Sequence, residues 1–144
     1  MKTLPQSWYE GEFELAVIER IGDLAIAKKS YRNLPRKNKE GEIIGLEERS
    51  GKLVAYEVAY VQSRGDMLYP GSDEVSEARE FWPGDSSFGK EAWTTSTLER
   101  AQEILSRELR IEEWLKANPL SLSSSVNPKE VKSTRVHAKA ALGL

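Results

Sequence analysis

Residues 12–31 have the sequence EFELAVIERIGDLAIAKKSY, and this stretch decides the fold. From Phe13 to Ile18 the side chains alternate as they do on the two faces of a β-strand. Gly22 and Asp23 follow, and a second apolar run begins at Leu24. Glycine at the first turn position supplies the positive φ angle that a two-residue type II′ turn needs. We therefore predict a β-hairpin over residues 12–31.

Short apolar runs bounded by turn residues continue this pattern along the chain. Runs of this length that are bounded by Gly, Pro, Ser or Asp are typical of further strands. The predicted strands are residues 43–46, 53–61 and 92–94, and the predicted loops are 33–41 and 62–72. Between them, the spacing of Val75, Ala78 and Trp82 predicts one short helix over 73–82.

The clearest helix signal follows the last predicted strand. Ser96 and Glu99 have the spacing of a capping box, in which the serine accepts from a backbone amide and the glutamate reaches back. The apolar side chains that follow share one helical face. Pro119 cannot continue a helix, so we predict that the helix spans 97–117.

These elements predict an α+β fold. We expect a mostly antiparallel sheet of four to five strands with the long amphipathic helix packed on it. The expected domain is 1–118, and a Ser/Pro linker covers 119–128. Residues 129–144 form a flexible basic tail, for which a short helix from His137 to Leu142 is the structured alternative.

The residue inventory argues against most catalytic chemistry. The chain has no cysteine, and its one histidine, His137, lies in the tail. Zinc and other transition-metal sites use these residues, and so do the common catalytic triads, so we predict no metal, no cofactor and no catalytic residue, and we lean away from an enzyme. The sequence has no cysteines for disulfides, no apolar leader at its start and no apolar run long enough to span a membrane. We therefore expect a cytoplasmic protein with no membrane partner.

Aromatic residues among Gly, Pro, Asp and Ser in residues 64–93 indicate a surface that binds a protein partner, because aromatics are enriched where proteins bind each other. We therefore predict a non-enzymatic interaction protein that binds a partner or a second copy of itself. The predicted partner-binding residues are Arg64, Asp66, Tyr69, Trp82 and Phe88. The tail 129–144 is the second predicted docking surface.

Two alternatives remain open at this point. The first is a nucleic-acid-binding accessory protein, which would use the tail and a basic loop at 28–39. Its predicted contacts are Lys28, Lys29, Tyr31, Arg32, Arg36 and Lys37. For this segment we favour a different interpretation, in which the charges of the loop protect a strand edge from aggregation. The second alternative is a carboxylate-based hydrolase or transferase that uses Arg64 and Tyr69.

Overall fold

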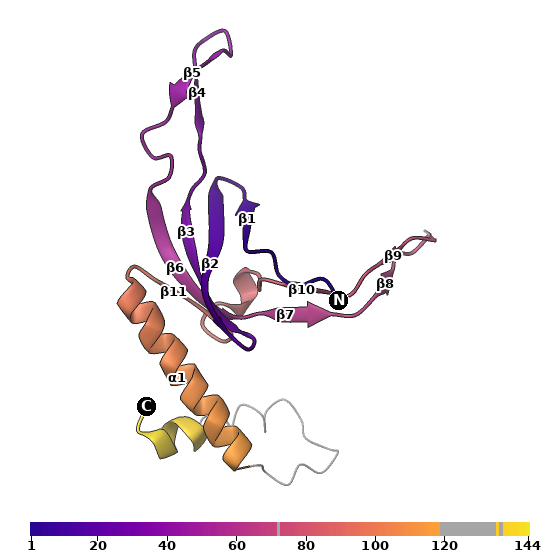
Figure 1. Ribbon diagram of the computed structural model, residues 1–144, viewed down its shortest axis with the longest axis vertical. Coiled ribbons are helices and arrows are strands. Elements are labelled where there is room, and N and C mark those ends of the chain that lie inside the picture. The colour runs from indigo at the N-terminus through magenta and orange to yellow at the C-terminus, as the bar shows by residue number, and fades with distance from the viewer. Residues whose placement is uncertain (72, 119–134, 136) are drawn as a thin grey trace. The chain divides into compact units, whose positions relative to one another are not determined.

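The computed structural model describes residues 1–71, 73–118, 135 and 137–144 (Figure 1). Within them the chain forms two compact units, Met1–Ala101 (unit 1) and Gln102–Leu144 (unit 2). The predicted linker 119–128 lies outside the described residues, and the predicted domain boundary at 118 stays a prediction. No helix in the described part of the chain combines the length and the apolar character that a membrane span requires.

Unit 1 contains a five-stranded sheet in which every neighbouring pair is antiparallel. Its strands, in spatial order, are β1 (Ser7–Glu10), β2 (Phe13–Ile21), β3 (Leu24–Tyr31), β6 (Leu53–Tyr60) and β11 (Ala92–Thr95). With the long helix that follows β11, this sheet confirms the predicted α+β class. The predicted hairpin is β2–β3. At its turn Gly22 has φ +61°, and no non-glycine residue in the described chain has a positive φ, so Asp23 meets the requirement of a type II′ turn.

One face of this sheet carries the apolar core of unit 1. Cross-strand partners project to the same face, and the register aligns Ala25 of β3 with Ala59 of β6 and Ala59 with Ala92 of β11. These small side chains leave room for large rings above them. The core cluster consists of Leu15, Ala25, Ala27, Ala59, Val61, Trp82 and Ala92, with Leu4, Trp8, Phe13, Val17 and Phe88 packed against it. Leu24, Ile26 and Val58 are buried on the opposite face.

Two β-hairpin arms extend beyond this sheet from opposite ends of β6 (Figure 1). Arm 1, residues 33–52, joins β3 to β6 and contains β4 (Pro35–Lys37) paired with β5 (Ile43–Leu46). Arm 2, residues 62–81, follows β6 and contains two further pairs. These pairs are β7 (Gln62–Arg64) with β10 (Arg79–Phe81), and β8 (Met67–Leu68) with β9 (Val75–Ser76).

The arms correct three predictions. The loop predicted at 33–41 contains β4, and the loop predicted at 62–72 contains β7 and β8. The helix predicted at 73–82 is wrong, because β9 and β10 occupy this segment. Periodicity over ten residues cannot separate a helix from two short strands when the strands depend on partners earlier in the chain. The predicted strands at 43–46, 53–61 and 92–94 are present as β5, β6 and β11.

The long helix is α1 (Leu98–Ala117), close to the predicted span. Its N-terminal cap is one residue later than predicted: Thr97 Oγ1 accepts from the backbone N–H of Arg100 at 3.2 Å. The predicted capping box at Ser96 and Glu99 is therefore replaced by a single threonine cap. The helix ends as predicted, and the Asn118 side chain donates to the Trp114 carbonyl at 2.9 Å.

Unit 2 is built from α1 and a short helix over 137–142. Glu108 in α1 is fully buried there, and it forms ion pairs with Arg107 at 3.3 Å and with Arg135. Ala138 is fully buried, whereas the neighbouring His137 is exposed. The described part of the tail thus contains a short helix over 137–142, followed by a turn at Gly143.

Candidate functional site

The predicted partner-binding residues separate into two groups. Arg64, Asp66 and Tyr69 belong to arm 2, whereas Trp82 and Phe88 lie over the core of unit 1. Trp82 is only 8% exposed, so its ring is not available as a docking residue in this structure. Phe88 is half-buried against the same cluster. The exposed aromatic among the five is Tyr69.

Trp82 is held over the sheet by a buried carboxylate. Its indole Nε1 donates to Oε1 of Glu57 at 3.1 Å, and Lys29 Nζ lies 3.8 Å from Oε2. Burial raises the pKa of Glu57, and the indole hydrogen bond and Lys29 oppose that shift. The Trp8 ring packs on Trp82 with centroids 5.5 Å apart. Both oxygens of Glu57 therefore face groups of the protein, which is an arrangement that positions Trp82 and does not suit proton transfer to a substrate.

The base of arm 2 is clamped to the rest of unit 1. Glu80 of β10 accepts from Arg20 at 3.0 and 2.7 Å and from the Leu4 backbone N–H at 3.0 Å. The Arg20 interaction and the Leu4 hydrogen bond lower the pKa of Glu80 to about 2. The backbone of Lys2 also bonds to one edge of this segment in a parallel bridge with Arg79, since its N–H donates to Ala78 and its carbonyl accepts from Glu80. Arm 2 is therefore a fixed extension of the sheet.

Arg64 and Asp66 support the arm from within. Arg64 Nη2 donates to Ser76 Oγ at 2.6 Å, which joins β7 to β9 across the arm. Asp66 Oδ1 accepts from the Ala78 backbone N–H at 2.6 Å. These two predicted partner-binding residues thus hold the two strands of the arm together where its tip begins.

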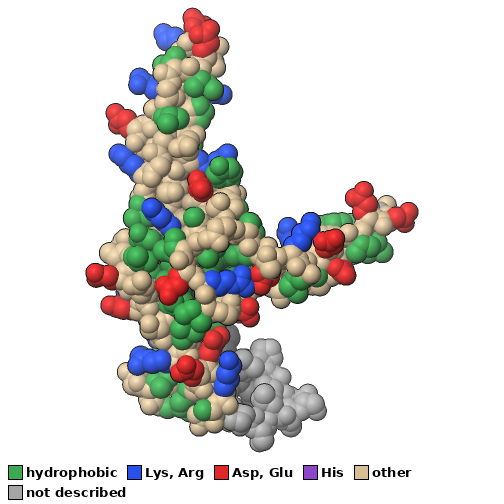
Figure 2. All heavy atoms as spheres, in the orientation of Figure 1, with side chains coloured by type: hydrophobic (Ala, Val, Ile, Leu, Met, Phe, Trp, Pro, Cys, Tyr) green, Lys and Arg blue, Asp and Glu red, His purple; other side chains and the backbone are tan. Residues whose placement is uncertain are grey.

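The tip of arm 2, residues 66–77, is apolar and acidic. Four of its large apolar residues are 45% to 64% exposed: Met67, Leu68, Tyr69 and Val75. The same twelve residues include four Asp or Glu and no Lys or Arg. Figure 2 shows green apolar and red acidic side chains together along this arm. Sequence reasoning missed Met67, Leu68 and Val75, although the dipeptide Pro70-Gly71 after a short apolar run is a turn signal.

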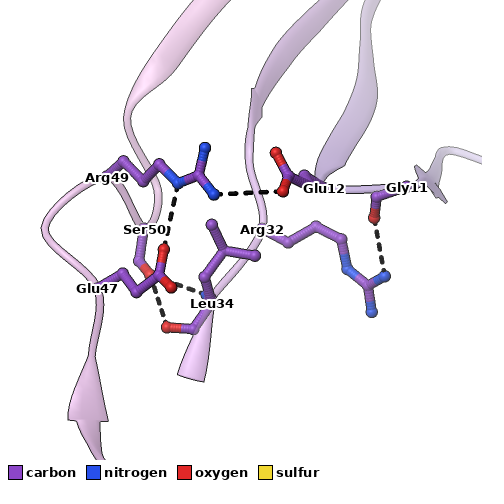
Figure 3. A network of polar contacts seen from close by, with 7 residues as sticks. All are labelled: Gly11, Glu12, Arg32, Leu34, Glu47, Arg49 and Ser50. Atoms are coloured by element: carbon purple, nitrogen blue, oxygen red, sulfur yellow. Dashed lines mark hydrogen bonds and ion pairs between the residues drawn. The ribbon is translucent and has the colours of Figure 1, made fainter. Parts of the chain in front are cut away.

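Arm 1 is anchored at its base by a polar network (Figure 3). Arg49 donates to Glu47 and to Glu12, each at 3.2 Å, and its guanidinium lies 5.0 Å from the Tyr31 ring centroid. Ser50 Oγ accepts from the Leu34 N–H at 2.8 Å and lies 3.2 Å from the Leu34 carbonyl. The network joins both strands of the arm to the β1–β2 turn.

The tip of arm 1, residues 35–46, is apolar and weakly basic. Ile43, Ile44 and Leu46 of β5 are 57% to 68% exposed. Three Lys or Arg and two Asp or Glu lie in the same segment. Figure 2 shows green, blue and red side chains along this arm, with red ones at its end. Sequence reasoning placed 43–46 in the sheet as a strand and did not predict that its apolar side chains are exposed.

The structure does not gather the predicted nucleic-acid contacts on one face. Lys28 and Lys29 are neighbours on β3 and so point to opposite faces, and Lys29 pairs with Glu57 and lies 4.5 Å from the Phe13 ring centroid. Arg32 stacks on Tyr9 at 4.0 Å and donates to the Gly11 carbonyl at 3.1 Å. Tyr31 packs on Phe13, and Arg36 and Lys37 are exposed on β4.

The described residues contain no group of three or more His, Cys, Asp or Glu side chains placed to hold a metal ion. Comparison with known proteins gave no match to a family model, to a curated protein or to a solved structure.

Proposed function

We propose that this chain is a cytoplasmic, non-enzymatic interaction protein that binds a protein partner through the tip of arm 2. The observation that carries the proposal is the exposure of four large apolar residues on a two-stranded tip whose base is clamped by Glu80 and Arg20. Exposed apolar patches of this kind mark binding surfaces in soluble proteins. A clamped base means that little conformational entropy is lost when the tip binds.

The strand geometry supports a partner that adds a strand. Within the described residues, β8 and β9 pair only with each other, so each has one edge without a neighbouring strand. Such edges bind an extended segment of another protein through main-chain hydrogen bonds, while side-chain contacts give specificity. The acidic residues of the tip favour a partner that carries Lys or Arg beside its apolar residues.

Affinity capture with a matched pair of variants tests this proposal. Leu68 and Val75 are cross-strand partners on β8 and β9, and the double variant Leu68→Ser/Val75→Ser removes the apolar contact that they offer. We expect it to lower the recovery of a specific protein partner by about tenfold or more. The control is Ile18→Ser/Ile21→Ser, which changes two exposed isoleucines of β2 and should leave recovery unchanged.

Two results would contradict the proposal. Equal recovery with both double variants would show that the tip is not the binding surface. Recovery of nucleic acid alone, lost on Arg36→Ala/Lys37→Ala, would instead support the nucleic-acid alternative. Of the predicted second docking surface, the tail 129–144, the structure describes residues 135 and 137–144, and its role in binding stays a prediction.

A further inference from the structure

The tips of both arms carry exposed apolar side chains close together on one strand. Met67 and Leu68 are consecutive on β8 and so project to opposite faces, whereas Ile43 and Ile44 of β5 lie at a register shift against β4, where regular alternation of faces does not hold. All four residues are exposed. A strand that is apolar on both faces is typical of a strand buried inside a sheet or an assembly. The arm 2 tip therefore has the composition of a strand that becomes buried when a partner is present, and the arm 1 tip offers three exposed apolar residues to a partner.

The charges of the two tips are complementary. The arm 2 tip, 66–77, carries four acidic residues and no basic ones, whereas the arm 1 tip, 35–46, has more basic than acidic residues. The basic residues, Arg36, Lys37 and Lys39, lie on β4 and just beyond it. Arm 1 thus presents the combination of exposed apolar and basic residues that the arm 2 tip favours in a partner.

The two tips of a single chain are kept apart by the sheet. Arm 1 enters β6 before Leu53, and arm 2 leaves it after Tyr60, so the arms start from opposite ends of this strand. Figure 1 shows the two arms at these ends. Eight residues of extended strand span roughly 26 Å, and each arm extends away from its end. A contact between an arm 1 tip and an arm 2 tip is therefore a contact between two copies.

We propose that the arm 1 tip of one copy binds the arm 2 tip of a second copy. The inference rests on the proposed function and names the partner of that surface as the chain itself. Because the two tips are different surfaces, the contact is head-to-tail, and repeated contacts produce a closed ring or a filament. Each internal copy in such an assembly has both of its tips covered.

Charge reversal tests this contact by sedimentation velocity on the full chain. Variant A is Arg36→Glu/Lys37→Glu in arm 1, and variant B is Asp73→Lys/Glu74→Lys/Glu77→Lys in arm 2, which leaves Asp66 as the one acidic residue of that tip. The wild-type chain should associate with rising concentration, and added salt should weaken the association. Each variant alone should associate at least about tenfold more weakly, because its two tips then carry like charges.

Mixing the two variants provides the control for folding and specificity. The reversed arm 1 of variant A then meets the reversed arm 2 of variant B, and the two unchanged arms also match. An equimolar mixture should therefore recover the association that each variant lacks alone. Lys28→Glu, an exposed reversal on β3, should leave association unchanged.

A wild-type chain that stays monomeric at all concentrations would overturn the head-to-tail contact, and so would association that survives both reversals. Lack of recovery in the mixture, with both variants folded by circular dichroism, would also overturn it. The capture experiment separates this failure from failure of the proposed function. A different protein recovered in a tip-dependent way would leave arm 2 as the binding surface and exclude only the second copy as its partner.

Discussion

The indole of Trp82 donates a hydrogen bond to the buried carboxylate of Glu57, 25 residues earlier in the chain. Glu57 lies in β6, which precedes arm 2, and Trp82 follows the last strand of that arm. The bond therefore closes arm 2 back onto the sheet from which it starts. The ring contact with Trp8 adds β1 to the same junction.

Substitutions at Trp82 should separate packing from hydrogen bonding. Trp82→Ala should lower the free energy of unfolding by about 3–5 kcal/mol, because it leaves a cavity over the core. Trp82→Phe keeps most of the ring and should cost about 1–3 kcal/mol, since Glu57 loses its indole donor while buried. Urea unfolding measures both values. Equal losses for the two variants would show that ring packing contributes little beyond the hydrogen bond.

Glu57 should make stability fall as the pH rises. Burial holds its pKa above the ordinary value of 4.5, so the folded state binds this proton more tightly than the unfolded state. The stabilisation is present in full below about 4.5 and is lost as the pH rises through the raised pKa. Glu57→Gln cannot titrate, but it retains an acceptor for Trp82. As the pH rises through the raised pKa of Glu57, urea unfolding should therefore show the stability of this variant increasing relative to wild type. A difference in stability that stays constant over this pH range would contradict the raised pKa.

Glu80 should have the opposite pH dependence. Its pKa is lowered to about 2, so its contribution is present above the ordinary 4.5 and is lost as the pH falls toward 2. We expect Glu80→Gln to cost about 2 kcal/mol at pH 7, because the bonds to Arg20 and Leu4 weaken. The cost should nearly vanish close to pH 2. The control is Glu77→Gln, an exposed change on the same arm, whose free energy of unfolding should stay within about 0.5 kcal/mol of wild type. If Glu77→Gln lost as much stability as Glu80→Gln, that result would argue against the clamp.

The N-terminal cap of α1 can be tested at two adjacent residues. Thr97→Ala removes the oxygen that accepts from Arg100 and should lower the free energy of unfolding by about 1 kcal/mol. Ser96→Ala should change it by less than about 0.5 kcal/mol, because Ser96 is exposed and outside the cap. Thermal or urea unfolding of the two variants decides between the caps. A larger loss at Ser96 would restore the capping box that the sequence predicts.

Much of the candidate site could not be predicted from sequence patterns. Strand signals exist for arm 1 at 43–46, but the same apolar run fits a sheet interior and an exposed tip equally well. For arm 2 the sequence pattern predicts a loop and a helix, because strands of two and three residues are too short to show a period. Trp82 stands among turn residues and is nevertheless buried, since Glu57 supplies the partner for its N–H group.

The sequence by itself determined the elements that depend on neighbours along the chain. The β2–β3 hairpin follows from alternation and a glycine turn, and the span of α1 follows from its apolar face and Pro119. Tertiary structure alone decided which apolar residues are covered. Burial depends on contacts between residues far apart in sequence, such as Glu80 with Arg20 and Trp82 with Glu57. Those contacts fix arm 2 at its base and leave Leu68 and Val75 exposed at its tip.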